Sequence, residues 1–504
     1  MAQETGAKNP ISYSDIPDLS MIRVGDTYYM SSTTMHLSPG VPIMKSIDLV
    51  NWEIINYAYD VLDSGPKLTL SVGQNAYGRG SWASSLRFHQ GLYFVSTFSA
   101  TTGKTHIFYT NDIERGSWQQ TAFEPAYHDN TLFFDDDGKI YLIWGAGTLM
   151  IAELKDDYSG IMPNTEKVLI ENATAPAGTN VGLPAEGSQI FKVNGKYYLF
   201  NIAWPKDGMR TVIVHRADHI MGHYEGRVVL QDRGIAQGGV IDTPNRDWYA
   251  YLFRDYGAVG RIPYLVPVKW EDEWPVLGEN GEVPEELDLP VSKGISPNIV
   301  AFDNFERENE QESFPLVWQW NHNSDSIGWS LHQRKGHLRL TTTRVDSSFL
   351  QARNTLTQRT FGPVSTGIIK LETKGMVDGD IAGLTLLQRD YGFIGVQIEQ
   401  ETKYIVVDLA NDGQVSESAK IPFNGDEIYL KAFCDFRERT DKGYFYYSLD
   451  GVEWNRVGDE LQMKYTLPHF MGYRFGLFNY ATKSIGGYAD FDFFKISDEM
   501  PDLN

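Results

Sequence analysis

Residues 20–30 read SMIRVGDTYYM: a short apolar strand, a polar turn containing Gly25 and Asp26, and a second strand that begins with two tyrosines. This pattern is typical of a β-hairpin, because glycine and aspartate favour tight turns and aromatic residues favour strands. Similar patterns follow as SLRFHQGLYF (85–94), TLFFDDDGKIY (131–141), SQIFKVNGKYY (188–198) and, more loosely, GVIDTPNRDWY (239–249). The first three hundred residues are therefore a repeat.

The spacing of the copies predicts the architecture. Successive copies begin roughly 45 to 65 residues apart, which is the length of one four-stranded blade of a β-propeller. Turn residues recur at short intervals and helical periodicity hardly occurs, so an all-β chain is expected. Five copies predict a five-bladed β-propeller. The alternative, a β-sandwich with unrelated hairpins, would not require five glycine–aromatic pairs in register.

A second domain follows the repeat. The stretch 281–297 contains glycine, proline and acidic residues without a strand pattern, and is interpreted as a linker. Beyond it, alternating segments such as GHLRLTTT (336–343) and YFYYSLD (444–450) indicate strands. The sequence therefore predicts a propeller over residues 9–294 and a C-terminal β-sandwich over residues 300–496.

Charge and cysteine content narrow the class of ligand. The formal net charge of −22 argues against nucleic acid and anionic membrane, which are recognised through basic patches. The single cysteine, Cys434, cannot form an intramolecular disulfide, and neither a thiolate metal site nor an HExxH motif occurs. No run approaches the roughly 18 apolar residues of a membrane span, and the first residues lack a signal pattern. We expect a neutral ligand and a periplasmic or secreted protein whose leader is absent from this chain, with the cytoplasm as the alternative.

Acidic residues stand at matching positions just before the repeated hairpins. Asp18, Asp129 and Glu186 each lie two residues before a copy, and Trp82 lies three residues before another. Equivalent positions in a propeller converge on its axis, so three carboxylates would share one cavity, where like charges keep at least one group protonated. Glycoside hydrolysis needs a protonated acid beside an ionised base, and an indole offers a stacking face for a sugar. Solvated surface acids are the alternative, which the common offset disfavours.

Together these motifs resemble glycoside hydrolase family 43, whose members are five-bladed propellers. The second domain, with DNF (303–305) and WQWNHN (318–323), is similar to the concanavalin-like sandwich of that family's β-xylosidase and α-L-arabinofuranosidase branch. The motifs that carry the resemblance in the propeller are NP (9–10), PDLSMIR (17–23), VGDTYY (24–29), PGVPI (39–43), SIDLVNW (46–52), WASSLR (82–87), HD (128–129), AEG (185–187), QGG (237–239) and GR (260–261).

The resemblance implies a role for each site residue. Asp18 would be the general base that deprotonates water, Glu186 the general acid, and Asp129 the carboxylate that orients this acid and keeps it protonated. Arg261 would hold a hydroxyl of the sugar to be released, and Gln237 would contribute to substrate binding. The family inverts stereochemistry, so the base and the acid should stand roughly 6.5–9.5 Å apart to admit a water.

Departures from the family pattern modify these expectations. Ala236 stands where relatives often have a histidine of the channel ion site, which argues against a structural calcium ion at the propeller centre; no cofactor is expected for catalysis. His36, in Met-His-Leu (35–37), replaces an aromatic pair and is expected to offer a hydrogen bond to a sugar hydroxyl. From the sandwich, Tyr391 and Phe393 are the candidates to reach the propeller pocket.

The predicted function is an inverting, exo-acting glycoside hydrolase that releases terminal pentose from plant cell-wall oligosaccharides or polysaccharides. The altered residues 35–37 favour α-L-arabinofuranosidase over β-xylosidase, with a bifunctional enzyme between them. An endo-arabinanase would need an open groove, and a non-catalytic sugar-binding protein would not need all three carboxylates.

Overall fold

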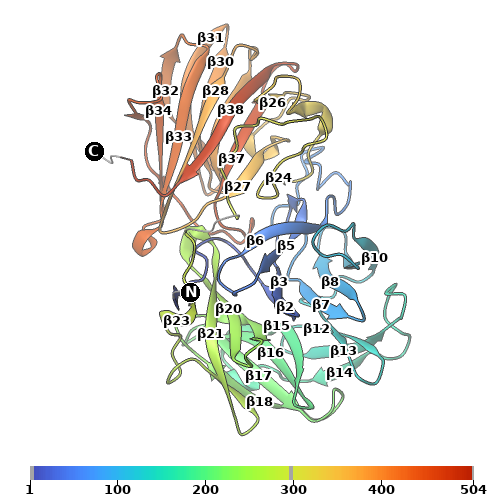
Figure 1. Ribbon diagram of the computed structural model, residues 1–504. Helices are drawn as coiled ribbons and strands as arrows, with labels where there is room; N and C mark the ends of the chain where they lie inside the picture. Colours follow the sequence, from blue (N-terminus) through green and yellow to red (C-terminus); the bar gives the residue numbers. More distant parts are fainter. Residues whose placement is uncertain (1–4, 295–298, 502–504) are drawn as a thin grey trace.

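The computed structural model describes residues 5–294 and 299–501, and its regular secondary structure consists almost entirely of strands (Figure 1). It confirms the predicted all-β fold, a five-bladed propeller followed by a concanavalin-like sandwich. Among the described residues no helix is long and apolar enough to cross a membrane. The helices that do occur are short 3-10 turns, η1 (Ala175–Ala177), η2 (Gly257–Val259), η3 (Ser326–Gly328), η4 (Phe349–Gln351) and η5 (Arg437–Arg439).

Each blade is a four-stranded antiparallel sheet that begins with one of the five repeated hairpins. The innermost strands β2, β7, β11, β15 and β19 contact one another in cyclic order around the axis. The blades comprise β2 (Ser20–Val24), β3 (Thr27–Ser31), β5 (Gly40–Ser46) and β6 (Glu53–Tyr59); β7 (Ser85–His89), β8 (Leu92–Ser99), β9 (Lys104–Thr110) and β10 (Gln119–Phe123); β11 (Thr131–Phe134), β12 (Ile140–Trp144), β13 (Leu149–Leu154) and β14 (Lys167–Ile170); β15 (Val181–Val193), β16 (Lys196–Pro205), β17 (Thr211–Ala217) and β18 (Glu225–Leu230); β19 (Ala236–Asp242), β20 (Trp248–Asp255), β21 (Arg261–Glu271) and β22 (Trp274–Leu277).

The seam between the last and the first blade closes the ring. Tyr251 and Leu265 of the fifth blade pack in one apolar cluster with Met30 of the first blade. Burial of the Leu265 and Met30 side chains contributes about 1.5–3 kcal/mol each. Outside the ring, β1 (Thr5–Lys8) pairs with β23 (Glu286–Pro290). The prediction that residues 281–297 contain no strand is therefore wrong for β23, and residues 295–297 lie outside the described part of the chain.

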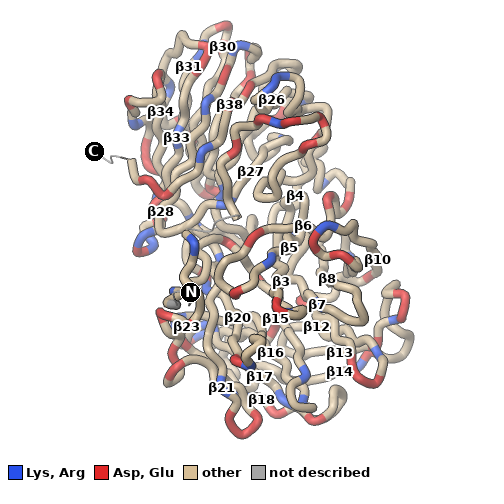
Figure 2. Tube along the Cα trace, viewed as in Figure 1, with Lys and Arg blue, Asp and Glu red and all other residues tan. Residues whose placement is uncertain are grey.

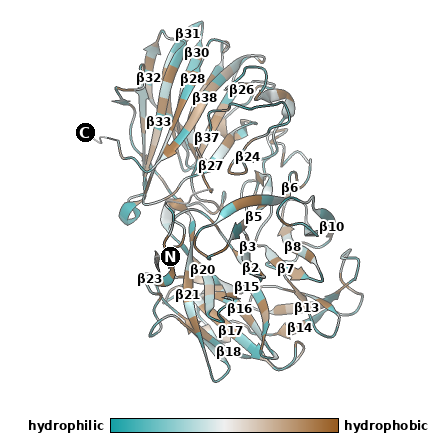
Figure 3. Ribbon diagram, in the orientation of Figure 1, coloured by the Kyte–Doolittle hydropathy of each residue, from teal (hydrophilic) through white to brown (hydrophobic). Residues whose placement is uncertain are grey.

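The sandwich consists of two stacked antiparallel sheets with the order β32-β31-β30-β29-β37-β27-β24-β4 and β25-β26-β38-β28-β33-β34-β35, with β36 beside β34. Hydrophobic and hydrophilic residues are mixed along the strands of both sheets (Figure 3). The bounds are β4 (Leu37–Ser38), β24 (Gln319–Asn321), β25 (Trp329–Ser330), β26 (Leu338–Thr341), β27 (Leu356–Arg359), β28 (Val364–Glu372), β29 (Asp380–Leu387), β30 (Gly392–Glu399), β31 (Thr402–Asn411), β32 (Gln414–Phe423), β33 (Glu427–Asp435), β34 (Lys442–Ser448), β35 (Asn455–Arg456), β36 (Leu461–Gln462), β37 (Arg474–Ala481) and β38 (Tyr488–Ser497).

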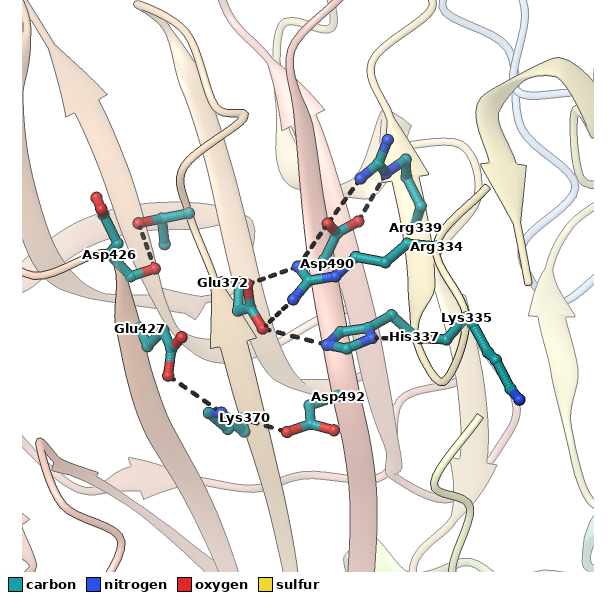
Figure 4. Close-up of polar contacts among 11 residues, drawn as sticks. Arg334, Lys335, His337, Arg339, Lys370, Glu372, Asp426, Glu427, Asp490 and Asp492 are labelled. Carbon is teal, nitrogen blue, oxygen red and sulfur yellow. Dashed lines mark hydrogen bonds and ion pairs between the residues drawn. The ribbon is translucent and has the colours of Figure 1, made fainter. Parts of the chain in front are cut away.

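Charged side chains cross the outer face of the second sheet as a connected network (Figure 4). Arg334 donates to both oxygens of Glu372 at 2.5 and 2.7 Å and also contacts Asp490 at 3.0 Å. Arg339 holds Asp490 through two hydrogen bonds, and His337 lies 3.1 Å from Glu372. The Arg339–Asp490 pair joins neighbouring strands, whereas Arg334 and His337 reach Glu372 from the loop before β26. Positive and negative charges are balanced in this network, although the whole chain carries a net charge of −22 (Figure 2).

The two domains share a sheet. Strand β4 belongs to the first-blade segment but pairs with β24 of the sandwich, with Trp320 opposite Ser38 and Asn321 opposite Leu37. The sandwich thus continues into the propeller by backbone hydrogen bonds as well as by side chains. This contact holds the sandwich over the end of the propeller that carries the predicted carboxylates.

Candidate active site

The predicted carboxylates come together because each precedes or interrupts an innermost strand. Asp18 and Asp129 stand just before β2 and β11, and Glu186 lies in β15 between two irregularities of its pairing with β16. Asp18 (φ 50°), Asp129 (φ 47°) and Gln237 (φ 55°) adopt the left-handed backbone region, which is uncommon for such residues and occurs often at functional sites. Asp18, Asp129 and Gln237 line one small cavity of about 10 Å³, room for a single water.

Asp18 is held as an acceptor by two buried donors. The Arg261 guanidinium donates from Nη1 to Oδ1 at 2.7 Å, and the Thr33 hydroxyl donates to Oδ2 at 2.7 Å. Arg261 is itself buried and lies over the ring of Phe470, 4.5 Å from its centroid. The structure therefore pairs Arg261 with the predicted base, a contact that the two-residue motif gave no means to foresee. A carboxyl group with both oxygens fixed is suited to orienting a water.

The imidazole of His128 lies close to the carboxylates of both Glu186 and Asp129. Its Nε2 lies 3.0 Å from Glu186 Oε2 and 3.8 Å from Asp129 Oδ2, while the Gly187 N–H donates to Asp129 at 3.0 Å. Burial raises the pKa of Asp129 to about 7; the neighbouring His128 opposes this shift, and the charges of Glu186 and Asp18 add to it. This carboxyl therefore holds a proton up to neutral pH.

His128 is a site residue that sequence reasoning missed. Burial lowers its pKa, but the hydrogen bond with Glu186 and the charges of Asp129, Glu186 and Asp18 outweigh burial and raise it to about 9. Its edge also contacts the ring of Phe98, with centroids 5.2 Å apart. The only signal in the sequence was its place directly before Asp129.

Aromatic rings from both domains form a wall beside the carboxylates. Trp82 lies between Phe98 of the propeller and Phe470 of the sandwich, with centroid distances of 5.8 and 4.9 Å. The prediction that Tyr391 and Phe393 reach the pocket is wrong, because both are buried in a sandwich core cluster. Phe470 makes this contact instead, from a loop whose sequence carries no repeat register.

His36 lies in a buried cluster between the domains. Its side chain is 1% exposed, and its ring centroid is 4.6 Å from those of Tyr77 and His322 and 6.2 Å from that of His469. A sugar hydroxyl could reach His36 only if this cluster opened. The structure therefore does not bring His36 to the carboxylates, and the change at residues 35–37 acts on the packing between domains.

The axis below the carboxylates already contains a cation. Arg87 Nη2 donates to Thr131 Oγ1 at 2.7 Å and to Gln189 Oε1 at 3.1 Å. These side-chain oxygens face a guanidinium, so they do not fit a calcium ion at the same level. His128, Asp129 and Glu186 also place ligand atoms within 4.8 Å of one another; His128 is hydrogen-bonded to Glu186, and Asp129 accepts a hydrogen bond from the Gly187 N–H.

A larger cavity of about 460 Å³ opens at another level of the innermost strands. It is lined by Arg23, Phe88, Phe134 and Trp248 among others, and by none of the seven predicted site residues. The larger cavity therefore does not mark the candidate active site, which is located instead by the convergence of the carboxylates.

Comparison with known proteins gives matches over both domains. Residues 7–275 match the model of glycosyl hydrolases family 43, and residues 303–497 match that of the beta xylosidase C-terminal concanavalin A-like domain. A beta-xylosidase of Formosa agariphila is 27% identical (98% of this chain, 90% of that protein), and a non-reducing end alpha-L-arabinofuranosidase of Bacteroides ovatus is 26% identical (77% and 75%). The solved structure of a bifunctional GH43-CE protein of Bacteroides eggerthii is 62% identical with a TM-score of 0.98; it covers 99% of this chain, which spans 65% of that protein.

Proposed function

This chain belongs to glycosyl hydrolase family 43, and on that premise we propose that it releases single xylose units from the non-reducing ends of β-xylosides. Hydrolysis of α-L-arabinofuranosides is the second candidate, supported by the name of the Bacteroides ovatus relative. The sequence argument for arabinose rested on residues 35–37, which are buried between the domains. Without that argument, the beta-xylosidase name of the relative that aligns with 98% of the chain favours xylose.

The observation that carries the proposal is that the three carboxylates have different hydrogen-bond partners and different surroundings. Asp18 accepts two short hydrogen bonds, one of them from a guanidinium, whereas Glu186 contacts His128, beside Asp129, whose buried carboxyl holds a proton up to neutral pH. An ionised base facing a protonated acid group is the arrangement that hydrolyses a glycosidic bond. In this mechanism Asp18 takes a proton from water, and Glu186 gives one to the leaving oxygen.

Exo action is supported by the sandwich. Phe470 closes one side of the pocket against Trp82 and Arg261. A closed side suits the end of a sugar chain, whereas an endo-arabinanase needs an open groove. Products from linear xylo-oligosaccharides and from linear arabinan distinguish these cases, because exo action yields only the monosaccharide at early times.

The first test compares nitrophenyl β-D-xyloside with nitrophenyl α-L-arabinofuranoside, using the wild type and Glu186→Ala. We expect higher kcat/KM on the xyloside, and loss of activity in the variant. Preference for the arabinofuranoside would support the second candidate, and wild-type activity of Glu186→Ala on xylobiose, whose leaving oxygen needs a proton, would contradict the assigned acid. Proton NMR of the first-formed anomer tests inversion: α-xylose is expected from a β-xyloside.

Glu186→Gln is expected to separate substrates by leaving group. Because an acid protonates the departing oxygen, kcat on xylobiose should fall by about 10²–10⁴-fold, and kcat on dinitrophenyl xyloside should fall much less. Steady-state kinetics on both substrates measure the difference. Equal losses on the two substrates would show that Glu186 does not act as the acid.

Phe470→Ala is expected to lower kcat/KM on xylobiose by about tenfold, corresponding to about 1.4 kcal/mol, since it removes an aromatic wall of the pocket. Phe302→Ala is the matched control, because Phe302 is an exposed phenylalanine elsewhere on the sandwich. A similar loss in both variants would assign the effect to the stability of the sandwich.

A further inference from the structure

His128 is the most solvent-exposed member of the acid group. The exposed fraction of its side chain is 41%, compared with 19% for Glu186 and 7% for Asp129. The same imidazole lies 3.0 Å from the Glu186 carboxylate through Nε2, and the Phe98 ring supports it. His128 therefore contacts both bulk water and the predicted acid.

Inverting hydrolysis creates a need for such a group. In each turnover the acid loses a proton to the leaving oxygen and the base gains one from water, so both must exchange protons with solvent before the next cycle. Asp18 and Asp129 are buried, and Glu186 is enclosed by protein on most of its surface. Imidazole is the side chain best suited to move protons near neutral pH.

We propose that His128 is a positioning residue that returns a proton from solvent to Glu186 between turnovers. The Nε2–H bond of the imidazolium breaks as an O–H bond forms on Glu186 Oε2, which leaves a neutral imidazole with its remaining proton on Nδ1. A hydronium ion from solvent then restores the imidazolium. The need for this step rests on the proposed inverting hydrolysis. The effect of Glu186 on the titration of His128, in contrast, does not depend on which reaction the enzyme catalyses.

The charges around His128 support this role. Glu186, Asp129 and Asp18 all act on the ring and hold its pKa near 9, so the imidazolium is the populated form when Glu186 is ionised. Arg261 moderates the charge of Asp18 through their ion pair. Once Glu186 has given up its proton, an adjacent proton donor is therefore in place.

The coupling is tested without any substrate. Ring-labelled histidine, followed by ¹⁵N NMR from pH 5 to 10, should show His128 titrating well above 6.5 in the wild type. Glu186→Gln should lower that titration midpoint by at least one pH unit, and His128→Asn identifies the signal. If Glu186→Gln leaves the midpoint unchanged, the proposal is wrong, whatever glycoside the enzyme hydrolyses.

The kinetic test uses His128→Asn, which can still hydrogen-bond but cannot carry a proton at neutral pH. We expect kcat on xylobiose to fall by about 10–10²-fold and kcat on dinitrophenyl xyloside to change little. His89→Asn is the matched control: His89 is another partly exposed histidine, which stacks on Phe134 at 4.5 Å and ends the innermost strand β7 of the second blade. It should behave like the wild type.

Chemical rescue separates proton supply from packing. Added imidazoles should restore kcat of His128→Ala on xylobiose, with a rescue rate that follows the pKa of the azole. Rescue that is independent of azole pKa, or a His128→Asn enzyme with wild-type rates on both leaving groups, would overturn the proposal. Absence of pentosidase activity in the wild type would contradict the proposed function, and the NMR titration would still decide the coupling.

Discussion

Asp18→Asn is expected to lower kcat/KM on every glycoside by about 10²–10⁴-fold, irrespective of the leaving group. An amide cannot take the proton from water, and the displacement needs this proton transfer whichever leaving group departs. The amide also leaves the buried Arg261 guanidinium without its carboxylate partner at 2.7 Å. The measurement is kcat/KM on nitrophenyl xyloside and xylobiose, with equal losses expected.

Asp26→Asn provides the control for this experiment, because Asp26 is an exposed aspartate in the turn of the same hairpin. It should retain wild-type kinetics. Near-normal rates in Asp18→Asn would refute the assignment of the base and the argument from repeat register. A loss on xylobiose alone would instead place Asp18 on the acid side of the reaction.

Replacing His36 by glutamine is expected to change how stability depends on pH. Burial lowers the pKa of His36 from 6.5 to about 3, so the unfolded chain binds a proton that the folded protein excludes. This penalty is absent above pH 6.5 and grows as pH falls toward 3; at pH 4 it amounts to roughly 3 kcal/mol. His36→Gln should therefore gain about that much relative to the wild type between pH 7 and pH 4.

Urea unfolding of both proteins at several pH values measures this difference. His219→Gln serves as the control, since His219 is exposed and its replacement should leave the pH dependence unchanged. Parallel curves for His36→Gln and the wild type would show that His36 titrates normally in the folded state. His322 and His469, whose pKa values burial also lowers, should make the wild-type loss steeper.

The propeller and its acids were predictable because their signals are local. A hairpin is specified within about eleven residues, and a carboxylate at a fixed offset from each hairpin is carried to the axis by the repeat. The convergence of Asp18, Asp129 and Glu186 could therefore be predicted without any knowledge of long-range contacts. The strand β23, by contrast, is only five residues long, ends at a proline and pairs with β1 from the other end of the propeller sequence, so its short alternation of polar and apolar residues was overlooked.

The residues that the sequence did not reveal depend on contacts between distant segments. Phe470 reaches Trp82 across the domain boundary, 388 positions along the chain, from a loop without periodicity. His36 was expected in the pocket because residues 35–37 replace an aromatic pair of the family, but packing with Tyr77 and His322 buries it. Such positions follow from how two domains dock, which no single segment encodes.

We expect the fold to open first at the seam between the first and the fifth blade of the propeller. Asp18 stands at the entry to the first blade and Arg261 begins β21 of the fifth, so their ion pair spans the joint. Asp15 reinforces the joint by accepting hydrogen bonds from the Arg261 and Gly472 backbones, and Gly472 belongs to the sandwich. A partial opening confined to this joint would separate the base from its guanidinium while the other blades stay folded. On heating, activity should then be lost at a lower temperature than the β structure. Because the sandwich contacts Asp15 at this joint, it should determine how long the enzyme stays active at a given temperature.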